Sequence, residues 1–245
     1  MCTYGCFHGV MTQMFSTGSG TLGGQIEDET PAEYLAHIEA SAQTLCTRAA
    51  AEGVVHPRYC YHGLGHIFSY FSGQDLDMAI QRCNMFEAEG PKGSCRSGAF
   101  MEYLLSTTSA RVLYTKGEAP CDAYPDFLRR CYRFKAYGWL YVWGGVENAL
   151  KACDSFGKNT LLCISNTAEA ASSPEAVATE AGLEKICGTL SGEKHTACLH
   201  GAILKVLSVT DGDDSEHACD AVVSTQRQTC LDVREEYRGD LYFEG

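Results

Sequence analysis

The spacing of the cysteines constrains the fold of this chain more than any other sequence feature. Twelve of the 14 cysteines fall into pairs whose members lie 10 to 14 residues apart, and the second members recur every 32 to 36 residues. A period near 34 residues with two helices per unit is typical of α-helical repeat arrays. We therefore predict an all-α array of six to seven disulfide-stapled helical hairpins, either a Sel1- or TPR-like α-solenoid or a compact closed array.

We expect the paired cysteines to form disulfides rather than metal clusters, because the chain lacks C-x-x-C and zinc-finger spacings. Each disulfide would join the end of one helix to the start of the next and contribute about 3 kcal/mol. Cys2 and Cys6 remain, to pair with each other or with partners upstream. The predicted pairs are Cys46–Cys60, Cys83–Cys95, Cys121–Cys131, Cys153–Cys163, Cys187–Cys198 and Cys219–Cys230.

Disulfides at this density indicate an oxidising compartment, so we expect an exported protein, extracellular or periplasmic. The net charge of −12 argues against nucleic-acid binding and against docking on anionic lipid. No apolar run is long enough for a transmembrane helix, and no signal peptide follows Met1. We therefore expect a mature fragment with an added Met1, one domain over residues 1–238, and a tag-like tail at 239–245.

Several helix boundaries follow from capping patterns. Thr30, Pro31 and Glu33 predict a helix that starts with a capping box and runs to about Glu52. Asp75 or Asp77 should cap a helix that reaches Cys83, and Ser173-Pro174-Glu175 should start one that ends at Cys187. The run Arg111 to Tyr114 is β-like in composition, and we interpret it as part of an enlarged loop.

One phrase is repeated along the chain in shortened form. Residues 58–68 (RYCYHGLGHIF) combine a cysteine, two histidines and two glycines, and Cys-x-His-Gly recurs at Cys6 and at Cys198. Glycine at this fixed position costs a helix about 1 kcal/mol against alanine. We therefore expect close helix approach at Gly9, Gly63, Gly98 and Gly201.

At these residues the chain resembles an uncharacterised bacterial family of cysteine-rich, exported helical proteins. The matching segments are Gly5 to Val10, Cys60 to His66 and, after Cys95, Ser97 to Glu102, with a looser match from Pro120 to Tyr132. This resemblance implies a fold and a motif but names no activity. A second resemblance, to disulfide-containing Sel1-like repeat proteins, is carried by Leu150 to Asp154 and by the period, and it implies architecture alone.

The histidines of the repeated phrase are the candidate site. His62 and His66 are spaced i, i+4 on one helix face, which suits two imidazole ligands of one zinc, copper or iron ion. His8 holds the first position in the preceding copy, and Glu102 lies one residue past the His66 position in the next. We predict His8, His62 and His66 as ligands and Glu102 as fourth ligand or general base.

The alternative for these histidines is structural, with each one bonded to a neighbouring carbonyl or packed beside a disulfide. His200 is left out of the site, because Leu204 stands where a second histidine would be. Trp139, Tyr141 and Trp143 alternate by two, so we expect some of them to be exposed.

Two functions stay open: a metal-binding protein, which includes a metalloenzyme, and a non-catalytic envelope scaffold that binds a peptide, glycan or partner protein.

Overall fold

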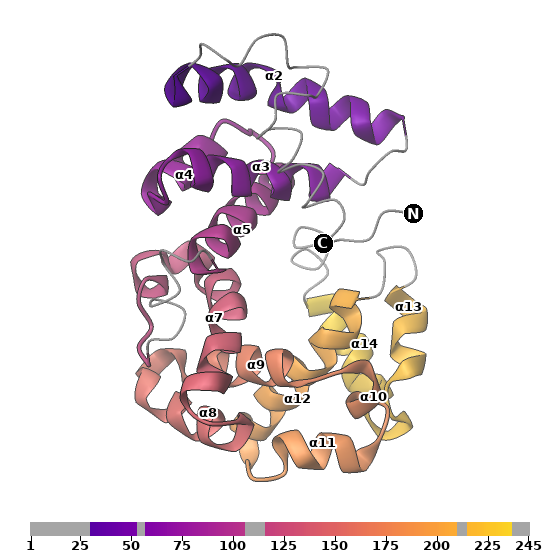
Figure 1. Ribbon diagram of the computed structural model, residues 1–245. Helices are drawn as coiled ribbons and strands as arrows, with labels where there is room; N and C mark the ends of the chain where they lie inside the picture. The colour runs from indigo at the N-terminus through magenta and orange to yellow at the C-terminus, as the bar shows by residue number, and fades with distance from the viewer. Residues whose placement is uncertain (1–29, 53–56, 106–115, 210–214, 237–245) are drawn as a thin grey trace. The chain divides into compact units, whose positions relative to one another are not determined.

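The computed structural model describes residues 30–52, 57–105, 116–209 and 215–236 (Figure 1). In these ranges the chain forms helices joined by turns, without a β-strand. The predicted all-α, disulfide-stapled fold class is confirmed. The β-like run at 111–114 and residues 1–29, which hold Cys2, Cys6, His8 and Gly9, lie outside the described part. None of the described helices is both long and apolar enough to cross a bilayer.

The chain divides into two compact units, one up to Ser109 and one from Ala110 onward. The first contains α2 (Pro31–Ala51), α3 (Pro57–Phe71), α4 (Leu76–Cys83) and α5 (Glu89–Leu105). In it α3 packs along α5, and α2 and α4 pack against this pair. That residues 1–238 form one domain stays a prediction.

The capping patterns of the first unit act as predicted. The Thr30 hydroxyl accepts a hydrogen bond from the Glu33 amide at 3.3 Å, and the Glu33 carboxylate accepts one from the Thr30 amide at 2.8 Å. Asp75 caps α4 by accepting a hydrogen bond from the Met78 amide at 3.0 Å. These bonds satisfy amide groups that lack a partner within the helix.

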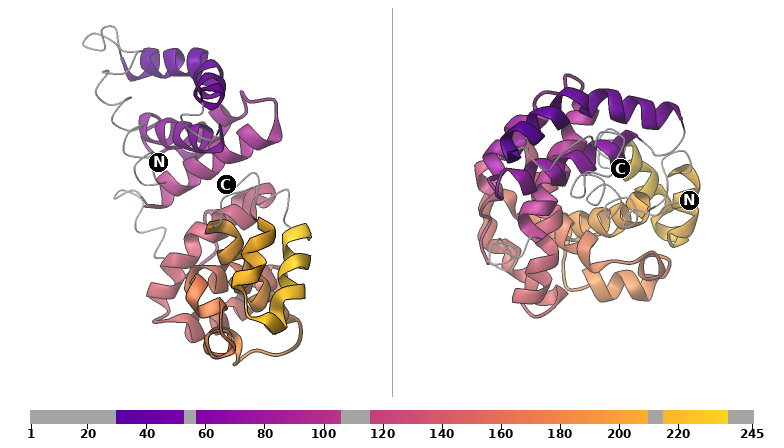
Figure 2. Two further views of the ribbon diagram at one scale, coloured as in Figure 1. Left: turned by 90° about the vertical axis from the view of Figure 1, so that its right-hand side faces the viewer. Right: turned by 45° about the horizontal axis from the view of Figure 1, so that its top comes forward.

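The second unit is built on three long helices, with shorter ones beside them. α7 (Leu128–Val142), α9 (Thr160–Ala171) and α12 (Gly192–Val209) follow one another side by side (Figures 1 and 2). The shorter elements are α8 (Val146–Ala152), α10 (Pro174–Val177), α11 (Glu180–Cys187), α13 (Ser215–Ala218), α14 (Arg227–Glu236) and the 3₁₀ turns η1 (Cys121–Ala123), η2 (Pro125–Phe127), η3 (Cys153–Asn159), η5 (Cys219–Ala221) and η6 (Ser224–Gln226).

The single helix predicted from Ser173 to Cys187 is wrong, because it breaks into α10 and α11. Ser173 caps α10, but Thr179 takes an extended conformation and caps a new helix by accepting from the Gly182 amide at 3.1 Å. A β-carbon at Gly182 would overlap the Ala176 carbonyl, so the break also lets the chain fold back closely on itself.

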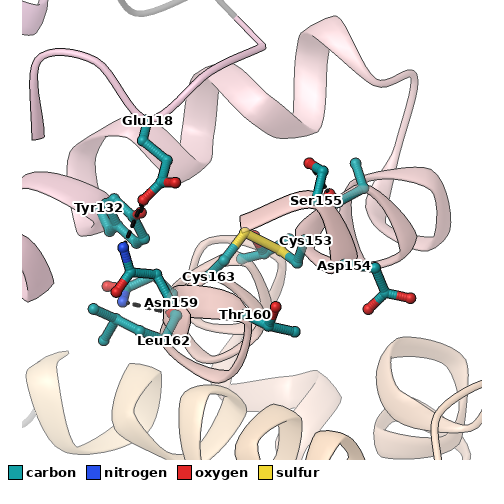
Figure 3. Close-up of a disulfide and its surroundings, with 12 residues drawn as sticks. Glu118, Tyr132, Cys153, Asp154, Ser155, Asn159, Thr160, Leu162 and Cys163 are labelled. Carbon is teal, nitrogen blue, oxygen red and sulfur yellow. Dashed lines mark hydrogen bonds between the residues drawn. A yellow bond between two sulfur atoms is a disulfide. The ribbon is translucent and has the colours of Figure 1, made fainter. Parts of the chain in front are cut away.

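All six predicted disulfides are present, with Cα atoms 5.5 to 5.7 Å apart, within the normal range. In three of them the first cysteine, Cys121, Cys153 or Cys219, begins a 3₁₀ turn. Cys153 is also the C-cap of α8, and Cys219 directly follows α13, so these two still lie at the end of a helix as predicted. Figure 3 shows one such case, in which the bond from Cys153 joins the short η3 to the buried start of α9 at Cys163.

Candidate functional site

Close contact between α3 and α5 positions the predicted histidines. A β-carbon at Gly98 would overlap the carbonyl oxygen of His62, and one at Gly65 would overlap the carbonyl oxygen of Cys95. The two backbones therefore touch at Gly65 and at Gly98, which confirms the predicted close approach at Gly98. As a result, side chains one turn further along each helix meet across the interface.

His62, His66 and Glu102 meet in this way. The Nε2 atoms of His62 and His66 lie 3.1 Å apart, and Nδ1 of His66 lies 2.9 Å from Oε2 of Glu102. His62 is buried, with 4% of its surface exposed, while the side chains of His66 and Glu102 are 13% and 28% exposed. The site therefore opens to solvent on the Glu102 side.

A residue in the turn after α3 forms a hydrogen bond with Glu102. Gln74 has a left-handed backbone, with φ of 67°, which is uncommon outside glycine. The side-chain nitrogen Nε2 of Gln74 donates a hydrogen bond to Oε1 of Glu102 at 3.5 Å, and the side-chain oxygen Oε1 of Gln74 accepts one from the Ser69 hydroxyl at 3.4 Å. Both carboxylate oxygens of Glu102 thus have partners. Nothing in the sequence pattern singled out Gln74 or Ser69.

These contacts limit where the protons lie. If the Glu102 carboxylate accepts the Nδ1–H of His66, a neutral His66 has a lone pair on Nε2. His62 then donates its Nε2–H to that lone pair. When His62 carries its proton on Nδ1 instead, both Nε2 atoms have a lone pair, and a lone pair on the ring nitrogen is what a metal ion requires of an imidazole ligand.

The predicted site is thus brought together in part. His62, His66 and Glu102 converge, whereas His8 lies outside the described residues. Over the described ranges, no three His, Cys, Asp or Glu side chains form a group that could hold a metal ion. The metal-ligand assignment of His8, His62, His66 and Glu102 therefore stays a prediction.

The second unit has a counterpart of the α3–α5 contact in α9 and α12. A β-carbon at Gly201 would overlap the carbonyl oxygen of Ser165, so the predicted close approach at Gly201 is also confirmed. Counted from the preceding cysteine, Ser165 holds the position of His62, and Glu169 that of His66. Glu169 pairs with Arg133 of α7 at 2.8 Å rather than with a histidine.

Two further ionisable groups are buried in α7. Tyr132 donates a hydrogen bond to the Glu118 carboxylate, which also accepts one from Asn159 at 2.7 Å (Figure 3). Burial, followed by the bond to Glu118, raises the pKa of Tyr132. Lys135 is fully buried, and burial lowers its pKa to about 8 while Asp122 acts in the opposite direction.

The alternating aromatic residues of α7 separate as expected. Trp139 is buried and packs edge-on against Tyr132, whereas Tyr141 is 77% exposed. Trp143 is half-buried, and the ammonium group of Lys116 lies 4.6 Å from its ring centroid. These rings contribute to the core and to the surface but do not converge on one site.

Comparison of the chain with models of known protein families, with curated proteins and with solved structures finds no match. The resemblances to a bacterial cysteine-rich family and to Sel1-like repeats therefore stay predictions.

Proposed function

We propose that this protein is an exported, disulfide-rich helical protein that binds one transition-metal ion through His62 and His66. The observation that carries the proposal is the 3.1 Å distance between the two Nε2 atoms. Zinc–nitrogen bonds of about 2.0–2.1 Å at a tetrahedral angle hold two imidazole nitrogens about 3.3 Å apart. The observed distance is thus close to that between two imidazole ligands of one zinc ion.

Glu102 fits this proposal as a residue that positions His66. Metal-binding histidines commonly donate their second ring N–H to a carboxylate, which fixes the ring and raises its basicity. The 2.9 Å contact with Nδ1 of His66 has this form. We assign Glu102 this role in place of the ligand or general-base role that the sequence predicted, because its two oxygens face His66 and Gln74.

A third ligand must come from elsewhere, since two imidazoles alone hold a divalent ion weakly. We propose His8, because the Cys6-x-His8-Gly9 phrase repeats the Cys60-x-His62-Gly63 phrase. Imidazole ligands suit zinc, copper and iron, and the six disulfides fit an oxidising compartment, either extracellular or periplasmic. We assign no reaction to the site.

The test is elemental analysis of disulfide-intact protein, purified without chelators or nickel resin and then dialysed against zinc. We expect about one zinc per chain, lost in His62→Ala/His66→Ala. The matched control is His195→Ala/His217→Ala, which removes two histidines of the second unit and should keep the metal. Glu102→Gln should keep the stoichiometry but weaken zinc binding about 10- to 100-fold.

Other outcomes separate the parts of the proposal. If His8→Ala binds zinc with unchanged affinity, only the assignment of His8 as third ligand is wrong. Equal zinc binding by the parent and by His62→Ala/His66→Ala, or no binding of zinc, copper or iron by the parent, would overturn the site. The two histidines would then be a hydrogen-bonded pair that supports the α3–α5 contact.

A further inference from the structure

A pocket in the second unit has no role in the proposed metal site. It has a volume of about 430 Å³, and residues of α9 and α12 line it together with Arg129 of α7. Known small-molecule pockets have volumes of about 300–1,000 Å³. The pocket is therefore large enough for a ligand of two amino-acid residues.

Residues at helical spacing on two facing helices form the walls. α12 contributes Glu193, Thr196, Ala197 and His200, and α9 contributes Leu161, Leu162 and Ser165. Gly201 brings these helices together, because its missing side chain lets the two backbones touch at the Ser165 carbonyl. The Cys-x-His-Gly phrase at Cys198 thus places its histidine in a pocket wall, a role that the sequence reasoning missed.

Ser165 adds a second observation at this place. The residue is buried, with 6% of its surface exposed, and within the described part of the chain its hydroxyl oxygen has no hydrogen-bond partner. Burying a hydroxyl without a partner costs about 1–3 kcal/mol. The hydroxyl is inaccessible in this conformation, and rotation of the side chain toward the pocket would let a ligand accept or donate the missing hydrogen bond and remove that cost.

The charges select the kind of ligand. Arg129 presents a guanidinium group, which binds carboxylates in bidentate fashion, and Glu193 presents a carboxylate, which binds ammonium groups. Leu161 and Leu162 supply apolar surface. A purely anionic ligand would face Glu193, and a purely cationic one would face Arg129. A molecule with both charges and an apolar side chain suits all of these groups.

We propose that this pocket binds a short apolar zwitterion, either a free amino acid or a small peptide. Its carboxylate pairs with Arg129, with His200 beside it, and its ammonium group pairs with Glu193. Its apolar side chains lie on Leu161 and Leu162. The proposal is independent of the metal site, since it uses other residues in the other unit.

The test is isothermal titration calorimetry of the disulfide-intact protein with the dipeptide Leu-Leu, acetyl-Leu-Leu, Leu-Leu amide and free leucine. We expect Leu-Leu to bind at least ten-fold more tightly than either blocked form. Arg129→Gln should remove the preference over the amide, and Glu193→Gln the preference over the acetylated form. Arg130→Gln is the control, because it removes the same charge one position along, from a side chain that faces Phe127.

Free leucine that binds as tightly as Leu-Leu would support the pocket and assign it to amino acids. Leu161→Glu places a charge on the half-exposed wall and should abolish binding without a change in the far-UV circular dichroism. Absence of Leu-Leu and leucine binding at millimolar concentration would overturn the proposal. Unchanged binding by both Arg129→Gln and Leu161→Glu would do the same.

Discussion

Both units contain a close contact between two long helices at a glycine, but the side chains around the two contacts differ. In each, a glycine three residues after a cysteine lies against a carbonyl of the preceding long helix, Gly98 against His62 and Gly201 against Ser165. The first unit adds a reciprocal contact at Gly65, whereas the second has Ala168 at the matching position. Both α3 and α5 therefore contribute a glycine to their contact, whereas in the α9–α12 contact only α12 does.

Equivalent positions of the two helix contacts hold side chains of different chemistry. Where the first unit places two imidazoles and a carboxylate, the second places a hydroxyl and an Arg133–Glu169 ion pair. Backbone contact fixes where these positions meet, and the side chains at them are then free to differ. Variants that alter one unit and its counterpart in parallel test this view.

The largest effect is expected from a β-carbon at the helix contacts. Gly98→Ala should lower the free energy of unfolding by about 3 kcal/mol and Gly201→Ala by about 2 kcal/mol, despite a gain of about 1 kcal/mol in helix propensity. Gly98 is the more sensitive because Gly65 leaves α3 and α5 no room to slide. Urea unfolding followed by circular dichroism measures both.

Gly117→Ala is the control, since no atom lies within 4 Å of its added β-carbon, and it should change stability by less than about 0.5 kcal/mol. If Gly201→Ala were as harmless as Gly117→Ala, the two contacts would not be equivalent.

Loss of a carboxylate should matter more in the second unit. Glu169 is 9% exposed and pairs with Arg133, so Glu169→Gln should cost about 2–3 kcal/mol by leaving a half-buried guanidinium without its carboxylate partner. Glu102 is 28% exposed, and Glu102→Gln should cost about 1 kcal/mol in metal-free protein. Thermal unfolding of the two variants under the same conditions gives the comparison.

The double variant Arg133→Met/Glu169→Met should recover most of the stability lost in Glu169→Gln, because paired apolar replacements leave no buried charge. Equal losses for Glu169→Gln and Glu102→Gln would mean that exposure does not separate the two contacts.

Lys135 should make the stability of the second unit depend on pH. Counted from the preceding cysteine, the same position is held by the buried Leu64, Ala99, Thr167 and Ala202 and by the partly exposed Arg234, so Lys135 is the one charged residue among its buried members. Because burial lowers the pKa to about 8, the unfolded chain binds more protons above that pH. The cost of the charge is therefore full below pH 8 and falls as the pH rises toward the unfolded pKa.

Lys135→Met should consequently be more stable than the parent by about 2 kcal/mol at pH 7, with the difference shrinking between pH 8 and pH 9.5. Urea unfolding across this range measures the slope, below the pH at which Tyr132 contributes. Lys151→Met, which removes an exposed lysine, is the control for the loss of one positive charge. A constant difference between parent and Lys135→Met would contradict the lowered pKa.

The smallest effects are expected at exposed ion pairs. Lys194 lies 2.6 Å from Asp154, but both side chains are about half exposed, so Lys194→Gln should cost less than about 0.5 kcal/mol. Arg82 and Glu39 in the first unit are less exposed, and Arg82→Gln should cost about 1 kcal/mol. A larger loss for Lys194→Gln in differential scanning calorimetry would reverse this order.

The cysteine spacing alone was sufficient to predict the fold class and all six disulfides. Each disulfide closes a short loop between helical segments that are neighbours in sequence, so its pairing depends on local distance. The start of α2 at Thr30 and the cap at Asp75 were predictable for the same reason. The break between α10 and α11 was not predictable. It depends on the hydrogen bond from the Gly182 amide to the Thr179 hydroxyl and on the close contact between Gly182 and Ala176.

The histidine pair was also predictable, since residues four apart on a helix share a face. What only the tertiary structure decided is which ring nitrogen Glu102 contacts, that Gln74 supports it, and that Arg133 reaches Glu169. The same holds for the pocket that His200 lines with Arg129. These residues lie 28 to 71 positions apart in the sequence, so their meeting depends on how the helices pack against one another, which sequence periodicity does not specify.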